Sequence, residues 1–246
     1  EVAALVKDLV SFFRNRNVQV MLLSEYGITD VSWPVYINRV FREKGLLSVR
    51  TERGLELLDA GASKAFAVAD HQIAHIYIKD GSKLEEVRSL VKAIPGVERV
   101  YEKSDDSLQL DHERSGDLIA VADASSWFTY YYWNDDKKAP DFARCVDIHR
   151  KPGYDPVELF TNPNDPLVSL KVIWKLIRKK LGFRTLMNVI PLQADLVKGS
   201  HGRIPEDTED HPLLIVDATS DLFEESIPAV HVHDLIKQQL TKNPNR

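Results

Sequence analysis

The sequence predicts an α/β fold with a mostly parallel sheet and helices on its faces. Apolar side chains repeat with helical spacing over residues 3–15, and the apolar run of residues 18–23 is typical of a buried strand. A second helix and strand are expected over residues 35–44 and 46–50, with Gly45 as a left-handed C-cap between them. Such alternation is typical of domains in which helices connect parallel strands.

The middle of the chain changes character and predicts a small α+β subdomain over residues 51–125. Strands are expected at residues 65–68, 73–78, 97–101 and 118–122, with a helix that begins at Ser82 and ends near residue 94. This strand–helix–strand–strand unit is predicted to be an insertion. Residues 1–50 and 126–246 would form the α/β core, with a helix over 168–181, a strand over 212–216 and a helix over 230–239.

Composition and charge exclude several classes of protein. The 246 residues are 43% hydrophobic, which is enough for a substantial core. The net charge of −5 gives no electrostatic reason to expect a nucleic acid polymer or an acidic membrane as partner. A single cysteine, Cys145, excludes an internal disulfide and favours a reducing, cytoplasmic compartment. No apolar run approaches the roughly 20 residues of a membrane span.

Two short loops carry polar residues that indicate chemistry. Ser24-Glu25-Tyr26-Gly27-Ile28 follows the apolar run 18–23, and Gly199-Ser-His201-Gly-Arg203 lies far downstream. An acidic turn at the end of a buried strand is where α/β enzymes place ligands and catalytic groups. The first loop resembles the Ser-Asp-His-Gly-Met loop of the alkaline phosphatase superfamily, in its nucleotide pyrophosphatase/phosphodiesterase branch. The second resembles the Gly-x-His-Gly segment of that family.

The resemblance covers nearly the whole chain and implies an alkaline phosphatase-like sandwich that carries the α+β insertion. It also implies a hydrolase that uses divalent metal ions, with zinc as first choice, on a small phosphorylated substrate. The bond cleaved would be a phosphomonoester, phosphodiester or pyrophosphate. The family's nucleophile, a Thr or Ser at a helix start, would lie before Glu1, so no catalytic nucleophile is assigned. The chain is interpreted as the C-terminal portion of an enzyme whose missing N-terminal half would be its partner.

In the family, the Asp and His of the first loop bind one catalytic metal, and the His of the second segment binds the other. The resemblance therefore implies His201 as a ligand of one metal and Glu25 as a carboxylate ligand of the second. The plain alternatives are an ordinary loop histidine and a solvated turn acid. Tyr26 stands where the family has histidine, and a neutral phenol is a poor zinc ligand. Tyr26 is expected to bind a phosphoryl oxygen instead, so the second metal site would be weakened, adapted to Mg²⁺ or Mn²⁺, or absent.

A third polar segment, Asp147-Ile-His149-Arg-Lys-Pro-Gly-Tyr-Asp155, offers a competing metal ligand. Its Gly153-Tyr-Asp155 is similar to the Gly-Tyr-Asp segment that follows the last metal histidine in nucleotide pyrophosphatases. In that family the histidine adjoins the glycine directly, whereas His149 lies four residues before Gly153. His149 is therefore a rival of His201 for the same role, and both assignments stay open.

Substrate-binding candidates come from two further places. Arg150 and Lys151 would hold a substrate phosphate as fixed positive charges, or else belong to a cationic surface loop. The turn Asp70-His71-Gln72 is predicted to reach the active site from the insertion, which makes Asp70 and His71 candidates as well.

Two alternatives to an active hydrolase follow from the same residues. The chain could be a degenerate, non-catalytic family member that binds a phosphorylated small molecule, or an inactive fragment that needs an N-terminal partner. The aromatic run Trp127-Phe-Thr-Tyr-Tyr-Tyr-Trp133 also has two interpretations. It could form a platform for a nucleobase or sugar, but packing between subdomains is the favoured interpretation, with some rings expected near the surface or a pocket.

Overall fold

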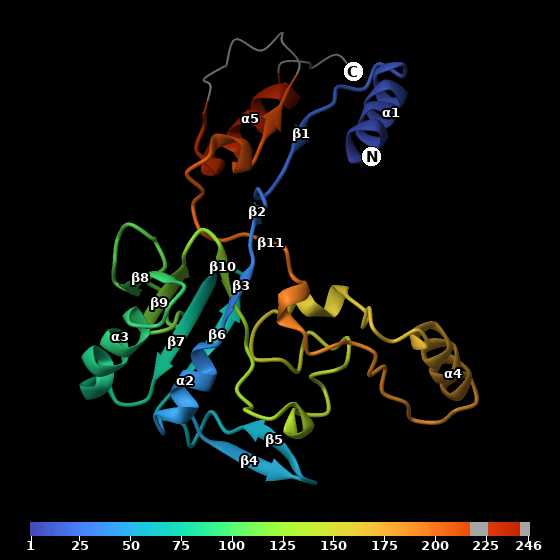
Figure 1. Cartoon of the computed structure of the whole chain (residues 1–246). Helices are drawn as coiled ribbons and strands as arrows, with labels where there is room; N and C mark the ends of the chain where they lie inside the picture. The colour runs from blue at the N-terminus through green and yellow to red at the C-terminus, as the bar shows by residue number, and fades with distance from the viewer. Residues whose placement is uncertain (217–225, 242–246) are drawn as a thin grey trace. The chain divides into compact units, whose positions relative to one another are not determined.

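The computed structural model describes residues 1–216 and 226–241. It divides into two units, which are described separately. The first unit contains the terminal segments Glu1–Glu25 and Pro212–Arg246, and the second contains Tyr26–His211 (Figure 1).

The described residues of the first unit contain two α-helices and one short pair of strands. The helices are α1 (Val2–Arg14) and α5 (Val232–Thr241), and the strands β1 (Leu22–Leu23) and β12 (Leu214–Ile215) pair antiparallel. The helix predicted over 3–15 is confirmed, but α1 buries none of its side chains. The buried strand predicted over 18–23 is wrong, because only Leu22–Leu23 is paired and Leu23 is 52% exposed.

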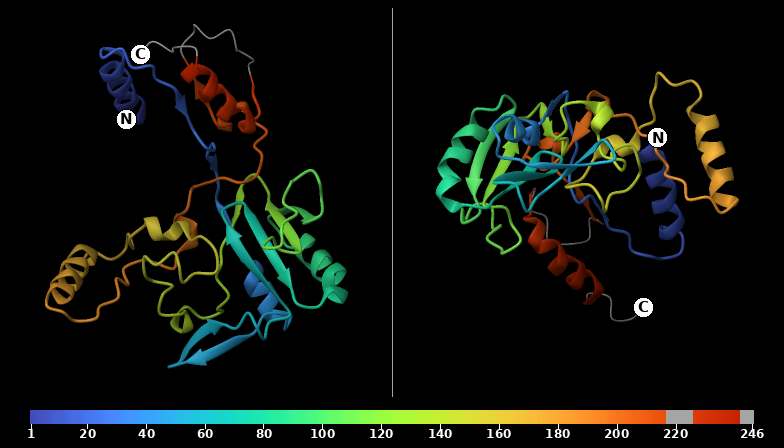
Figure 2. Two further views of the ribbon diagram at one scale, coloured as in Figure 1. Left: turned by 180° about the vertical axis from the view of Figure 1, so that it is seen from behind. Right: turned by 90° about the horizontal axis from the view of Figure 1, so that it is seen from below.

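A four-stranded antiparallel sheet organises the second unit. Its order is β6 (Ala65–Asp70), β7 (Ile73–Ile78), β9 (Leu118–Ala122) and β8 (Val97–Glu102). The helix α3 (Leu84–Lys92) lies along this sheet in Figures 1 and 2 and buries Val87 and Val91. These elements lie where the sequence pattern predicts the strands and helix of the α+β insertion, although its boundaries at 51 and 125 stay a prediction.

Shorter strands surround this sheet. The antiparallel pairs are β4 (Val49–Glu52) with β5 (Leu55–Leu58), and β2 (Thr29–Asp30) with β11 (Gly199–Ser200). The strand β3 (Trp33–Val35) pairs in parallel with β10 (Ser126–Phe128). The prediction of a mostly parallel sheet is therefore corrected, since the sheets of the described residues are mainly antiparallel. The two-residue turn between β6 and β7 shows the reason, because so short a connection can join only antiparallel strands.

The helix α2 (Ile37–Glu43) is joined to the sheet through a buried amide. Asn38 Nδ2 donates to the carbonyl of Ala67 at 2.8 Å, and the amide of Ala67 donates to Asn38 Oδ1 at 2.8 Å. The side chain thus pairs with the free edge of β6 as a neighbouring strand would.

The aromatic run 127–133 lies in the core of the second unit. All seven side chains are at most 2% exposed, so the expectation that some rings lie near the surface is wrong. Rings of this run pack against one another, with Tyr131 stacked on Trp133 at a centroid distance of 4.6 Å. Packing, the favoured interpretation, accounts for this burial, and the rings are not available as a platform.

The helix α4 (Val168–Lys180) confirms the helix predicted over 168–181, and it projects away from the sheet (Figure 2). It buries none of its side chains. Among the described residues, none of the helices combines the length and apolar character needed to cross a membrane. The remaining short elements are 3₁₀ helices at Gly81–Lys83, Asp136–Lys138, Pro156–Leu159, Ala194–Leu196, Thr208–Asp210 and Ala229–His231.

Candidate functional site

Four rings from distant parts of the sequence form a stack in the second unit. The ring centroids of Tyr26 and His201 are 3.7 Å apart with an interplanar angle of 12°. His201 lies 4.0 Å from His71 at 36°, and His71 lies 4.8 Å from Tyr154 at 28°. Three of these residues, Tyr26, His71 and His201, are candidates from the sequence. We call this group the ring cluster.

The ring cluster borders a cavity of about 210 Å³. Ser200 and Lys198 add polar groups to its wall, and Leu159 and Phe160 add apolar ones. Sequence reasoning missed Ser200 and Tyr154 as cavity residues. Both lie in the motifs that carry the family resemblance, Ser200 directly before His201 and Tyr154 in Gly-Tyr-Asp, and these motifs are the signal that could have found them.

The β6–β7 turn positions His71. Its backbone is left-handed, with φ +56°, and its carbonyl accepts a hydrogen bond from the amide of Phe128 at 2.7 Å. The next residue, Gln72, is buried, and its amide donates to the carbonyl of His201 at 2.9 Å. Gln72 Nε2 also donates to the carbonyl of Ser126 at 3.2 Å. These bonds hold the turn against β10 and against the segment that carries His201.

Close backbone contact positions Tyr154. Gly153 has φ +117°, and a Cβ there would overlap the carbonyl of Ala69 at the end of β6. The amide of Tyr154 donates to the same carbonyl at 2.9 Å. Because Ala69 lies two residues before His71, this contact brings the Tyr154 ring beside the imidazole.

A buried ion cluster supports the same loop. Lys151 Nζ lies 2.8 Å from Asp155 Oδ2 and 2.6 Å from Glu158 Oε1, and the side chains of all three are at most 6% exposed. Burial raises the pKa of Asp155, while Lys151 opposes this shift. The suggestion that Lys151 binds a substrate phosphate is therefore wrong, since its ammonium is enclosed and already paired.

Tyr26 and His201 are brought together by the pairing of β2 with β11. The strand β2 begins three residues after Tyr26, and β11 ends directly before His201. Next to this pair, the amide of Val31 donates to the carbonyl of Lys198 at 2.9 Å. Gly27 lies against the backbone of Asp210, where a Cβ would overlap the carbonyl oxygen. Only glycine permits this approach, so Gly27 places the adjacent Tyr26 ring.

His71 is neutral at physiological pH. Burial and the neighbouring His201 ring lower the pKa of His71 to about 4, although the Asp70 carboxylate, 4.0 Å from Nε2, acts in the opposite direction. Ser200 Oγ lies 3.4 Å from His71 Nδ1. Burial also raises the pKa of the Tyr154 phenol, which stays protonated. His71 and Tyr154 therefore offer neutral hydrogen-bonding groups to the cavity, beside Lys198 in its wall.

Other predicted residues lie outside the cavity wall. Arg150 Nη2 pairs with Asp141 at 3.0 Å, and its guanidinium lies 5.1 Å from the Phe142 ring centroid. His149 is an exposed neighbour on that loop. Asp70 is exposed but faces His71. Glu25 belongs to the first unit. The metal-binding roles of His201, His149 and Glu25, and the phosphate-binding role of Arg150, stay predictions.

The described residues do not form a complete metal site. No three His, Cys, Asp or Glu side chains in the described part of the chain lie where they could hold one ion together. His71 and His201 are the two imidazoles of the ring cluster, and their rings are tilted by 36° at a centroid distance of 4.0 Å. The donor set of the described residues is therefore incomplete for the metal centre that the resemblance implies.

Residues 1–155 match the type I phosphodiesterase/nucleotide pyrophosphatase family, and the chain belongs to this family. The matched segment contains Tyr26, His71 and Tyr154 of the ring cluster and ends at Asp155. The other two residues discussed, Ser200 and His201, lie beyond it. No curated protein matches the chain.

Solved structures give weaker likenesses. Phosphonoacetate hydrolase from Sinorhizobium meliloti 1021, in complex with phosphonoformate, is 17% identical with a TM-score of 0.33 and covers 46% of this chain and 28% of its own. Murine ectonucleotide pyrophosphatase/phosphodiesterase 5 is 19% identical with a TM-score of 0.36 and covers 55% of this chain and 33% of its own. The chain thus spans about a third or less of these proteins. Neither likeness supports an activity here.

Proposed function

We propose that this chain belongs to a metal-dependent hydrolase of phosphate esters, acting on a phosphodiester, pyrophosphate or phosphomonoester of a small molecule. The observation that carries the proposal is the family match over residues 1–155. The ring cluster supports the cavity beside it as the location of the proposed active site. Three of its residues, Tyr26, His71 and Tyr154, lie within the family match and meet at this cavity. Protonated phenols and a neutral imidazole are suited to donate hydrogen bonds to phosphoryl oxygens.

The metal is part of the proposal. Divalent zinc is favoured by the imidazole ligands that the resemblance implies, and Mg²⁺ or Mn²⁺ is the alternative if carboxylate and phenol oxygens dominate. When bound, such an ion would polarise the phosphoryl group. Because the described donor set is incomplete, we derive no reaction step through it. The groups of this chain would bind and orient the substrate from the cavity wall.

The first test measures metal content and turnover together. Elemental analysis of the purified protein and release of p-nitrophenolate from bis(p-nitrophenyl) phosphate are compared for wild type, His201→Ala and His112→Ala. His112 is an exposed histidine of the same unit and serves as the control. We expect His201→Ala to lose bound metal and to lower kcat/KM by about 100-fold, whereas His112→Ala retains both. Unchanged metal and rate in a folded His201→Ala would contradict the proposed role.

A second candidate is a non-catalytic member that binds a phosphorylated small molecule. The observation in its favour concerns Tyr26, which stands at the position where the family has a histidine ligand. Its ring is stacked face to face on His201. Calorimetric titration with bis(p-nitrophenyl) phosphate separates the two candidates. Saturable binding without p-nitrophenolate release, even with added Zn²⁺ or Mn²⁺, would favour the binder and exclude hydrolysis by this chain.

A further inference from the structure

A second cavity, of about 330 Å³, lies on one face of the four-stranded sheet. Along β9, Ile119 and Val121 alternate with Leu118 and Ala120 and therefore point to the opposite face. Val121 is paired with Ile73 of β7, which adds a third apolar side chain to that face. The apolar wall is completed by side chains from two irregular segments, so that it comprises Ile73, Leu108, Leu110, Ile119, Val121 and Ile204.

The charges at the rim of this cavity are balanced. Arg203 pairs with Glu98 through Nε and with Glu206 at 2.8 Å through Nη2. Arg99 Nε lies 3.2 Å from Glu98, and its Nη1 donates to the Tyr101 hydroxyl at 3.3 Å. Two arginines thus face two glutamates, and each guanidinium is already engaged. Such a rim selects neither an anion nor a cation, so an apolar, neutral group is the ligand that suits the cavity.

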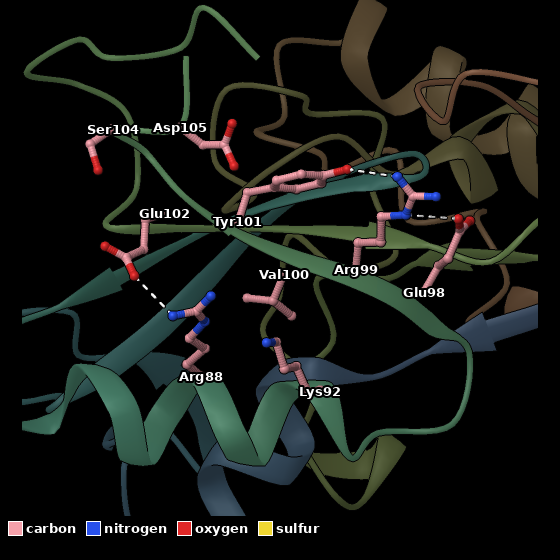
Figure 3. Close-up of a pocket in the computed structure, with 9 residues that line it drawn as sticks. All are labelled: Arg88, Lys92, Glu98, Arg99, Val100, Tyr101, Glu102, Ser104 and Asp105. Atoms are coloured by element: carbon pink, nitrogen blue, oxygen red, sulfur yellow. Dashed lines mark hydrogen bonds and ion pairs between the residues drawn. The ribbon is translucent and has the colours of Figure 1, made fainter. Parts of the chain in front are cut away.

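A neighbouring cavity is lined mainly by charged and polar side chains and lacks an apolar wall. It measures about 520 Å³ and shares Glu98, Arg99 and Tyr101 with the apolar one (Figure 3). Its other side chains include Arg88, which pairs with Glu102 at 2.9 Å. Charged groups of both signs line it, and Figure 3 shows most of them turned toward one another. It therefore carries no preference for a ligand class, whereas the apolar cavity does.

The apolar cavity shares a wall with the candidate site. Gly202 directly follows His201, and Ile73 follows the His71–Gln72 turn. A Cβ on Gly202 would lie 3.2 Å from Ile73 Cγ1, and Gln72 is bonded to the carbonyl of His201 at 2.9 Å. Two of the segments that form the ring cluster, those of His71 and His201, thus continue into the wall of the apolar cavity, so the two cavities adjoin each other.

We propose that this cavity binds a neutral, apolar ester group of the substrate, of the size of an aryl or bicyclic aromatic group. The inference rests on the proposed hydrolase function and names its substrate class. An apolar cavity of about 150 Å³ accommodates benzene, and ligand pockets of small molecules begin near 300 Å³. The volume therefore accommodates a bicyclic ring. Ile204, which is 83% exposed at the rim, would be covered by the bound group.

Binding is tested without any reaction. Indole, a neutral bicyclic probe, is titrated into the full chain carrying ¹³C-labelled isoleucine methyl groups, and their NMR shifts are followed. We expect saturable shifts at Ile73, Ile119 and Ile204, and none at Ile173, an exposed isoleucine on α4. Ile204→Asp should weaken binding at least about tenfold, whereas the matched control Ile173→Asp should not. Equal shifts at Ile173, or no saturation, would overturn the proposal.

The link to the substrate is tested by kinetics. Methyl p-nitrophenyl phosphate and 2-naphthyl p-nitrophenyl phosphate release the same reporter but differ in the second ester group. We expect kcat/KM to favour the naphthyl ester by at least about tenfold, and Ile204→Asp to remove that preference. Equal rates for both esters, together with no indole shifts, would overturn the inference and leave the hydrolase intact. If neither ester is cleaved, the hydrolase proposal fails, and the indole titration alone decides whether the cavity binds apolar groups.

Discussion

Lys151 illustrates how single residues hold the candidate site. Its ammonium is enclosed with two carboxylates, Asp155 and Glu158, in the loop that places Tyr154 beside His71. The two partners outnumber the cation, so the cluster carries an excess negative charge away from water. Removing one partner of a buried pair is costly because the other charge is left uncompensated.

We therefore predict that Lys151→Met destabilises the protein by about 3–5 kcal/mol at pH 7. The pKa of Asp155 is raised by burial and lowered by Lys151, so the variant raises it further. A carboxyl whose pKa is raised on folding binds its proton more tightly in the folded state, so stability increases as the pH falls through that pKa. The deficit should be smaller at pH 5 than at pH 7 in urea denaturation.

The control for this prediction is Lys171→Met. Lys171 pairs with Asp165 at the surface, where water screens the pair. Little change is expected at either pH. A Lys151→Met deficit that is the same at pH 5 and pH 7 would show that the loss comes from packing and not from the uncompensated carboxylates.

At the scale of elements, the site depends on backbone contacts between segments far apart in sequence. The loop at Gly153 pairs with the end of β6, and the Gln72 turn pairs with the segment at His201. Both contacts use backbone groups, which any sequence possesses. For that reason the sequence pattern places each element but does not show which elements meet.

Gly153→Ala should separate Tyr154 from His71. The new methyl group would overlap the Ala69 carbonyl, and the residue would also carry φ +117°. We expect a loss of about 3 kcal/mol in the free energy of unfolding, from strain and overpacking together. The matched control is Gly182→Ala, which has φ +86° but open space around it and should cost about 1 kcal/mol. Equal losses in the two variants would mean that the Ala69 contact is not close in solution.

At the scale of the whole molecule, stability is distributed unevenly. The four-stranded sheet and the aromatic run 127–133 contain about half of the buried apolar side chains, whereas α1 and α4 bury none. Helical stability in proteins comes mainly from packing of an apolar face, so unpacked helices open readily. We therefore expect a stable core and two helices, α1 and α4, that unfold locally at a low free-energy cost.

Hydrogen exchange on the full chain tests this distribution. Amides of β7 and β9 should be protected most strongly, and those of α1 should exchange several orders of magnitude faster. Measurement by mass spectrometry or NMR compares the elements in one sample. Protection of α1 equal to that of β7 would contradict the exposed state of its apolar side chains, which include Leu5, Leu9, Phe12 and Phe13.

The sequence by itself determined the family and most of the regular elements. Helices at α1, α3 and α4 and the strands β6 to β9 follow from apolar periodicity, because each pattern is local and repeats within a few residues. The motif at residues 24–28 and the Gly-Tyr-Asp segment indicated the family, which the match over residues 1–155 shows.

Only the tertiary structure decided the strand directions and the composition of the candidate site. Periodicity shows that a segment is a strand but not the direction of its neighbour, so the mainly antiparallel pairing was missed. Likewise, Lys151 resembled a phosphate-binding cation in sequence, yet folding encloses it between carboxylates. Tyr26, His71, Tyr154 and His201 are separated by up to 175 residues (201 minus 26), and only long-range packing brings their rings together.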